Sequence, residues 1–189
     1  MNLFLHGLEP KIYLGDSIYE SNRSEQYNCI LTNPPFGTKG ANQAPERDDF
    51  TIATSNKQLN FVQHIKTLLK STGKAAVVVP DNVLFEGGAG EIVRKKLLET
   101  TDLHTILRLP TGIFYAQGVK ANVIFFDSKP AAKEPWTKEV WYFDYRTNTH
   151  HTLKKDPLKL EDLQEFIKCY NPDNRHKRKE TWSGKNPEG

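Results

Sequence analysis

Short apolar runs alternate with amphipathic segments along this chain. The runs are rich in β-branched and aromatic residues, and they predict strands at 11–14, 27–32, 75–79, 103–109, 122–127 and 140–145. The apolar spacing elsewhere predicts helices around 59–69, 92–98 and 163–170. Gly73 and the pair Asn171-Pro172 are stop signals for the first and last helix. This alternation predicts an α/β sheet flanked by helices.

One connection, residues 37–55, is long and polar and reads GTKGANQAPERDDFTIATS. Loops of this length in compact domains are usually functional or disordered. Because it starts directly after a Pro-Pro turn, we interpret it as a lid over whatever that turn binds. Plain disorder is the alternative.

The turn itself, Asn33-Pro34-Pro35-Phe36, follows the strand predicted at 27–32. Ligands of open α/β sheets bind beyond the carboxyl ends of strands. Proline fixes φ, lacks an amide hydrogen and restricts the residue before it, so this turn is stiff. It presents two neighbouring acceptors, the side-chain oxygen of Asn33 and the backbone carbonyl of Pro34.

Two acceptors and an aromatic face suit a planar ring that carries an exocyclic amino group. Each acceptor takes one amino hydrogen, which directs the nitrogen lone pair toward an electrophile on the other side. Phe36 can stack on the ring, a contact worth roughly 1 to 3 kcal/mol for a base on an aromatic side chain. The alternative is a Pro-Pro turn that only ends a strand.

Charge is concentrated near the end of the chain. The formal net charge is +3, but the run RHKRK at 175–179 holds four positive charges, so the rest of the chain is close to neutral. A solvated tail and a phosphate-binding segment are the two interpretations of this run.

Composition argues against several other classes of protein. A length of 189 residues fits one ordinary domain. No run approaches the roughly 18 apolar residues of a membrane helix, so we expect a cytoplasmic protein without membrane contact. Cys29 and Cys169 have no metal-site spacing, and we expect Cys29 to be a small core side chain. We interpret His150 and His151 as exposed loop residues and expect no metal site.

The stretch NCILTNPPFG resembles the catalytic motif of amino-methylating, S-adenosylmethionine-dependent methyltransferases. Three further stretches narrow the resemblance: NLFLHGLEPKIYLGD, GKAAVVVPDNVLFEGGAGEIVRKKLLE and LHTILRLPTGIFYAQGVKANVIFF. Together, in this order, they resemble the adenine-N6 DNA methylase (modification) subunit of type I restriction-modification systems. The resemblance runs from about residue 2 to residue 126.

This resemblance implies a Rossmann-like methyltransferase sheet, S-adenosylmethionine as cofactor and a flipped adenine as target. Asn33 and the Pro34 carbonyl would hold the adenine amino group, Pro35 would shape the turn and Phe36 would stack on the base. Phe114 is the candidate second wall of the base pocket, with Tyr115 next to it, and a core aromatic is the alternative. The candidate cofactor contacts are Asp16 and Asn33, although Asp16 could also simply end a strand in a turn.

The implied partners are double-stranded DNA and the specificity and restriction subunits of a type I complex. The target adenine must leave the duplex, and phosphate contacts could offset part of that cost. The candidate residues for DNA phosphate contacts are Lys39, Arg47, Arg175, Lys177, Arg178 and Lys179.

Part of the family pattern is missing. The sequence has no glycine-rich cofactor loop, and we interpret the GGAG at 87–90 as a helix-entry turn. The resemblance implies the strand order 3-2-1-4-5-7-6, with family strands 1 and 2 absent. We therefore expect a partial domain: residues 1–150 as the C-terminal part of the catalytic domain and residues 151–189 as a C-terminal helix and basic tail.

Such a fragment would be inactive alone and would bind S-adenosylmethionine weakly. The strand at 27–32 would expose an edge that favours self-association. Two other functions stay open. One is an NPP-type protein-glutamine or RNA methyltransferase, and the other is a non-catalytic module that binds nucleic acid or a partner subunit.

Overall fold

The computed structural model describes residues 2–20, 25–36, 43–114, 118–146 and 149–181. Its helices and strands, in chain order, are α1 (Asn2–Leu5), β1 (Tyr27–Thr32), α2 (Lys57–Leu68), β2 (Leu69–Pro80), α3 (Asn82–Phe85), α4 (Ala89–Thr100), β3 (Thr101–Leu109), β4 (Ala121–Ser128), β5 (Trp141–Asp144) and α5 (Gln164–Tyr170). Short 3-10 turns cover Glu161–Leu163 and Arg175–Lys177. The predicted α/β fold is confirmed.

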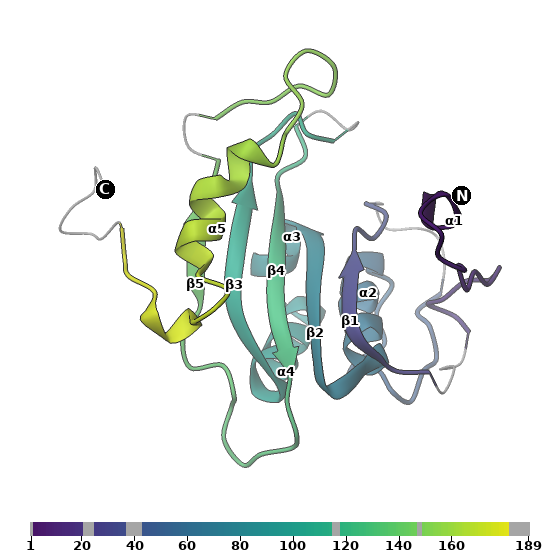
Figure 1. Ribbon diagram of the computed structural model, residues 1–189. Coiled ribbons are helices and arrows are strands. Elements are labelled where there is room, and N and C mark those ends of the chain that lie inside the picture. Colours follow the sequence, from purple (N-terminus) through teal and green to yellow (C-terminus); the bar gives the residue numbers. More distant parts are fainter. Residues whose placement is uncertain (1, 21–24, 37–42, 115–117, 147–148, 182–189) are drawn as a thin grey trace.

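The strands form one five-stranded sheet in the order β1-β2-β4-β3-β5 (Figure 1). β4 runs antiparallel to both neighbours, whereas β1 is parallel to β2 and β5 is parallel to β3. The first four strands thus follow the order 4-5-7-6 implied by the resemblance. β1 ends the sheet on one side, so the edge predicted for this strand is present among the described residues.

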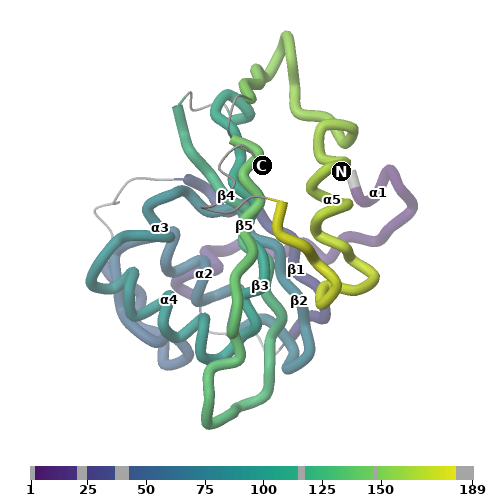
Figure 2. Tube along the Cα trace, turned by 90° about the vertical axis from the view of Figure 1, so that its left-hand side faces the viewer, coloured from purple at the N-terminus to yellow at the C-terminus, as the bar shows by residue number. Residues whose placement is uncertain are grey.

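Helices cover both faces of the sheet. Figure 2 shows α2, α3 and α4 on one side and α5 on the other. Successive residues of β4 serve the two sides, because side chains alternate across a strand. Phe126 packs in the core under α2 and α4, and Phe125 contacts the second core that contains Phe166 of α5.

A bulge in β3 changes this alternation. The register against β4 shifts between Leu103 and Thr105, so His104 is an extra residue in β3. Leu103 and Ile106 consequently share the core under α2 and α4, although their spacing would place them on opposite faces of a regular strand. His104 is buried and contacts the segment after α5.

The helix boundaries have clear local causes. The Asn56 side chain accepts from the amides of Gln58 and Leu59 and caps the start of α2. Gly88 has φ of 59° and precedes α4, so the predicted helix-entry turn of the glycine run is confirmed. Asn171 ends α5 in the left-handed conformation, with φ of 47°.

Two expectations about the first third of the chain are wrong. Residues 11–14 are exposed and form no strand, because no described strand lies beyond the edge of β1 to pair with them. Cys29 is an exposed thiol and not a core residue, because the outward-facing positions of an edge strand are not covered.

The described part of the loop predicted as a lid is fastened to α2. The side chain of Gln63 accepts from the amides of Thr51 and Ile52 and donates to the carbonyl of Ile52. The Asn60 side chain donates to the carbonyl of Thr54. Residues 43–56 are therefore a packed connection, and residues 37–42 lie outside the described part of the chain.

Among the described residues, no helix is both long enough and apolar enough to cross a membrane.

Candidate functional site

The candidate site lies at one edge of the sheet. The strand directions place the carboxyl ends of β1, β2, β3 and β5 and the amino end of β4 at this edge, uppermost in Figure 1. The segments that follow those strands are Asn33 to Phe36, Asp81, Pro110 to Phe114 and Arg146. This is the position at which open α/β sheets bind ligands.

The Pro-Pro turn is anchored at one residue and open at its neighbours. Pro34 is buried, whereas Asn33 and Pro35 are exposed and Phe36 is half-buried. A proline pair directly after an edge strand fixes the backbone without ladder hydrogen bonds. The polar side chain of Asn33 is thus held at the surface by a buried neighbour.

Phe36 and Phe114 meet across this edge. Their ring centroids lie 5.2 Å apart with an interplanar angle of 79°, an edge-to-face contact. The sequence places these residues far apart, in the turn after β1 and in the segment after β3. The structure brings the two predicted base-pocket aromatics together, while Tyr115 and Lys39 lie outside the described residues.

Asp81 and Asn122 form a polar pair at the same edge that the sequence analysis missed. The Asn122 side chain is fully buried and donates to the Asp81 carboxylate at 2.7 Å. The Asp81 amide donates to the carbonyl of Lys120, which extends the β2–β4 pairing by one step. The available signal was an acidic residue after the apolar run Val77 to Val79, separated from it only by Pro80.

The Asp81 carboxylate is kept ionised. Burial alone would raise its pKa, but hydrogen bonds from Arg146 and Asn122 outweigh that effect and hold the pKa below its ordinary value. The Arg146 guanidinium contacts both carboxylate oxygens, each at 3.0 Å. Asp81 is therefore an acceptor and a structural anion, not a proton donor.

Asp16 lies in a turn among exposed residues. Its carboxylate accepts from the Ile18 amide at 3.0 Å, and its carbonyl accepts from the amides of Tyr19 and Glu20. This geometry is that of an Asp that closes a turn.

Arg47, a candidate for a DNA phosphate contact, is bonded to internal partners. Its side chain is 3% exposed and forms a bidentate ion pair with Asp49, at 2.9 and 2.6 Å. It also donates to the Ser17 carbonyl and to Nδ1 of His64, both at 3.0 Å. The arginine joins the connection before α2 to the helix and to the turn at Ser17.

The basic run after α5 is partly bonded to the rest of the fold. Arg175 donates to the Asp127 carboxylate at 2.6 Å and contacts His104. Arg178 donates to the carbonyl of Tyr170 and to the Thr105 hydroxyl, both at 2.8 Å. The side chains of these two phosphate candidates are therefore bonded to α5 and the sheet. Lys177 and Lys179 are exposed.

The Asp127 carboxylate is held in its ionised form. Burial alone would raise the pKa of this carboxyl, but hydrogen bonds from His104 and Arg175 hold it well below its usual range. Burial also lowers the pKa of His104. Asp127 and Arg175 thus form an ionised pair between β4 and the segment after α5.

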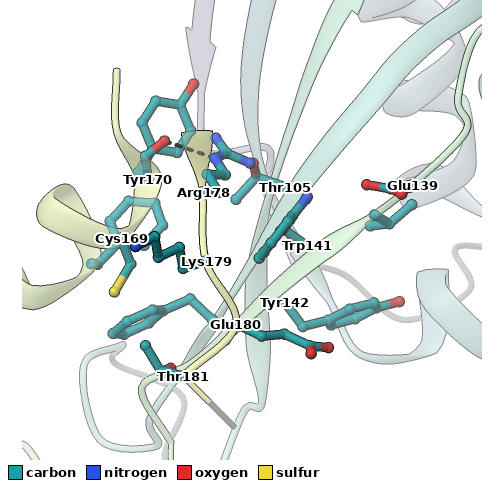
Figure 3. A pocket seen from close by; sticks show the side chains of 13 residues that line it. Thr105, Glu139, Trp141, Tyr142, Cys169, Tyr170, Arg178, Lys179, Glu180 and Thr181 are labelled. Atoms are coloured by element: carbon teal, nitrogen blue, oxygen red, sulfur yellow. Dashed lines mark hydrogen bonds between the residues drawn. The ribbon is translucent and has the colours of Figure 1, made fainter. Parts of the chain in front are cut away.

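That segment also lines a cavity of about 630 Å³, together with β5 and α5. Figure 3 shows aromatic side chains on its walls, among them Trp141 and Tyr170, with Arg178 bonded to Tyr170. No residue of the Asn33 to Phe36 turn lines it. This cavity is distinct from the candidate site.

The neighbouring histidines His150 and His151 differ in their burial. His150 is exposed as predicted, but His151 is buried, which corrects the second expectation. Its ring lies 2.9 Å from the Tyr145 hydroxyl and 3.1 Å from the Asp156 carbonyl. Within the described ranges, no group of three or more metal-ligating side chains is present.

Comparisons with known proteins agree with this arrangement. The sequence matches the family described as N-6 DNA Methylase over residues 1–186. It is 45% identical over 184 residues to the methylase subunit of the type I restriction enzyme EcoKI from Escherichia coli K12, a match over 92% of this chain and 34% of the relative. The EcoEI methylase subunit from Escherichia coli is 35% identical over 173 residues, 88% of this chain and 34% of that protein. The chain spans about a third (34%) of the length of these curated relatives.

Solved structures give the same result. The crystal structure of the EcoKI M protein superposes with a TM-score of 0.78 at 45% identity, over 89% of this chain and 37% of that chain. A modification subunit of a type I restriction enzyme from Vibrio vulnificus has a TM-score of 0.72 at 30% identity, again over 89% of this chain and 37% of that one. On these matches, the chain belongs to the N-6 DNA methylase family.

Proposed function

We propose that this chain forms the target-base part of an adenine-N6 DNA methylase subunit of a type I restriction-modification system. The observation that carries the proposal is the contact of Phe36 with Phe114 beside the stiff turn at Asn33. Two acceptors and two aromatic rings from separate strand ends then face one edge of the sheet. In this assignment residues 1–150 carry the chemistry and residues 151–189 support it.

The turn would act on the amino group of a flipped adenine. The Asn33 side-chain oxygen and the Pro34 carbonyl each accept one amino hydrogen, which leaves the nitrogen lone pair directed toward the methyl donor. Phe36 stacks on the base, and Phe114 supports Phe36 from its edge. A charged general base is unnecessary, because the amine can release its proton to solvent after transfer.

S-adenosylmethionine would supply the methyl group, but the described residues do not by themselves make up its site. They offer Asp16, which is already bonded to the Ile18 amide, and the Asn33 turn. A second segment must therefore supply the remaining contacts. We propose that it comes from the part of the relatives' length that this chain does not span.

DNA contacts would come from fewer residues than the sequence suggested. Extrusion of the base costs a few kcal/mol, and phosphate contacts offset that cost without reading sequence. Lys177 and Lys179 are the exposed candidates among the described residues. Lys39 stays a candidate from the sequence.

Partners and location follow from the same assignment. The relatives are named as subunits of type I restriction enzymes, and one similar structure, at 32% identity, concerns complex assembly of a type I system. We propose that this chain likewise works with specificity and restriction subunits on double-stranded DNA. It would then reside with the DNA, in the cytoplasm.

The first test is binding of S-adenosylmethionine, measured by titration calorimetry. We expect weak binding to the chain alone and micromolar binding once a polypeptide with the N-terminal strands of a relative is added. Micromolar binding by the chain alone would show that a cofactor site lies in residues that we interpret as scaffold.

The second test uses the complemented enzyme and labelled S-adenosylmethionine, with DNA, RNA and protein as substrates. We expect transfer to adenine in DNA, abolished by Asn33→Ala. Asn28→Ala is the matched control, because Asn28 is an exposed asparagine on β1, the strand that precedes the turn. Transfer to RNA or protein alone would favour the other NPP-type enzymes, and DNA binding without transfer would favour a non-catalytic module.

A further inference from the structure

We propose that Arg146 is a positioning residue that fixes the segment Pro110 to Phe114, called the loop below, against the Asn33 turn. The inference deepens the proposed function and rests on it, because it assigns a support to the second wall of the base pocket. Arg146 follows β5 and lies more than thirty residues from Phe114 in the sequence. The loop is held by two separate contacts, one from Arg146 and one from His151.

The first contact is the Arg146 guanidinium itself. Nε donates to the carbonyl of Leu109, the last residue of β3, at 3.1 Å. Nη2 donates to the carbonyl of Ala121, the first residue of β4, at 3.2 Å, and both Nη atoms bind the carboxylate of Asp81 after β2. One side chain, 15% exposed, therefore joins the ends of three strands at the candidate site.

Only arginine can make this set of contacts. Its planar fork carries five donors in fixed directions, and here it serves two carbonyls and one carboxylate at once. Lysine has a single ammonium group and could keep the Asp81 contact or the carbonyls, but not all of them. The shape of the guanidinium, and not only its charge, thus fixes the start of the loop at Leu109.

The second contact holds the middle of the loop. Gly112 has φ of 88°, and a Cβ added there would lie 3.0 Å from the carbonyl carbon of His151 and closer still to its oxygen. The His151 backbone is in turn fixed by its own side chain, which is buried and bonded to Tyr145 and to the Asp156 carbonyl. The loop is therefore held at two points, at Leu109 by Arg146 and at Gly112 by the His151 backbone.

The consequence concerns the position of one ring. Leu109 is held by Arg146 and Gly112 is packed on His151, so the chain between them has little freedom. Two residues later, Phe114 contacts Phe36 in an edge-to-face pair. If Arg146 is changed, the Phe114 ring should move away from Phe36 while the cores on both faces of the sheet stay packed.

The first experiment reads the ring directly, without methylation. The chain is labelled with 4-fluorophenylalanine, and the Phe114 and Phe36 signals are assigned by Phe114→Leu and Phe36→Leu. In Arg146→Lys and Arg146→Gln we expect both signals to shift or broaden in 19F NMR. The matched control is Arg108→Gln, because Arg108 pairs with Asp144 between the same two strands but is 40% exposed.

The second experiment measures catalysis and base flipping in the enzyme complemented with N-terminal strands. In Arg146→Lys we expect kcat to fall at least about tenfold, as for a misplaced positioning group, with the KM for S-adenosylmethionine unchanged. The fluorescence of 2-aminopurine at the target position should fall in parallel. Arg108→Gln should leave all three quantities unchanged.

The outcomes distinguish the positioning role of Arg146 from the proposed function. Unchanged fluorine signals in a folded Arg146→Lys protein, checked by circular dichroism, would overturn the positioning role. The same conclusion follows if Arg146→Lys raises the KM for the cofactor and leaves kcat intact. If the wild-type enzyme gives no methylation and no aminopurine signal, the proposed function fails, and the fluorine experiment still decides whether Arg146 positions Phe114.

Discussion

At the scale of single residues, the two prolines of the turn do different things. Pro34 is buried and anchors the turn to the sheet, whereas Pro35 is exposed and restricts the conformation of its neighbour. A hydrogen-bonded turn could open and close, but a proline pair offers no amide hydrogens to exchange between partners. The acceptors at Asn33 and Pro34 are therefore preorganised, which is the condition for electrostatic assistance at a reacting nitrogen.

Gly112 is the second residue whose identity is fixed by geometry. We predict that Gly112→Ala lowers the free energy of unfolding by roughly 1 to 3 kcal/mol, because a Cβ would be forced into positive φ and into the His151 carbonyl. Urea denaturation measures this change. Gly87→Ala is the control, because a Cβ at Gly87 meets nothing within 4 Å, and it should be close to neutral. Equal effects of both substitutions would contradict the close approach.

At the scale of elements, the connection before α2 is sensitive to pH. Burial, together with the Arg47 guanidinium, lowers the pKa of His64 to about 4. Below the ordinary histidine pKa of about 6.5 the unfolded chain takes up a proton, and the folded chain does so only near pH 4. We therefore predict that the contribution of His64 to stability is constant above about pH 6.5 and falls as the pH drops from there toward 4.

His64→Gln isolates this contribution. The glutamine keeps an acceptor for Arg47 but cannot be protonated, so the fall in stability between pH 6.5 and 4 should become smaller than in the wild type. Chemical denaturation at a series of pH values gives the comparison. His150→Gln, at an exposed position, should leave the pH dependence unchanged. A wild-type curve that rises toward pH 4 would contradict the prediction.

An ion pair between Arg175 and Asp127 holds the segment after α5 against the sheet. We predict that Arg175→Gln lowers the free energy of unfolding by about 2 kcal/mol, since it leaves the Asp127 carboxylate without its closest cation. Lys177→Gln, on the same segment, should change stability little because its side chain is exposed. The DNA affinity should respond in the opposite order, with Lys177→Gln weakening it and reducing its salt dependence. A larger effect of Arg175→Gln on the salt dependence would restore this arginine as a phosphate contact.

Periodic elements could be predicted from the sequence, and contacts between distant elements could not. The strands at 27–32 and 122–127 and the helix at 163–170 follow from local apolar spacing, and the structure confirms them. The strand at 11–14 has the same local signal but no partner strand, and pairing is not a local property. The bulge at His104 likewise depends on its register against β4.

The same limit applies to the candidate site. Asn33 and Phe36 were predictable because one short motif contains them, and Phe114 because a second motif does. Asp81 and Arg146 were not, since their roles arise only where strand ends meet. The ion pairs of Arg47 and Arg175 were not predictable either, because a sequence shows a charge but not the carboxylate that pairs with it in the fold.

At the scale of the whole molecule, the outer edge of β1 is where we expect one copy of the chain to associate with another. Leu31 on this strand is 77% exposed, and no described strand lies beyond it. We predict that the chain self-associates, because an uncovered strand edge is a template for pairing. Leu31→Lys should shift it toward monomer in light scattering, whereas Leu160→Lys, at an exposed site near α5, should not. A wild-type chain that stays monomeric at high concentration would contradict the prediction.

The order of the strands also governs how the chain folds during synthesis. β4 lies between β2 and β3, although the ribosome makes it after both. α2, β1 and β2 can associate early, but β3 has no neighbouring strand in the sheet until β4 has been made. The centre of the sheet therefore closes late, through contacts between distant parts of the chain, which slow folding. A nascent chain halted before β4 is complete would leave β3 and one edge of β2 without their partner strand. This interval is when chaperones would be needed most.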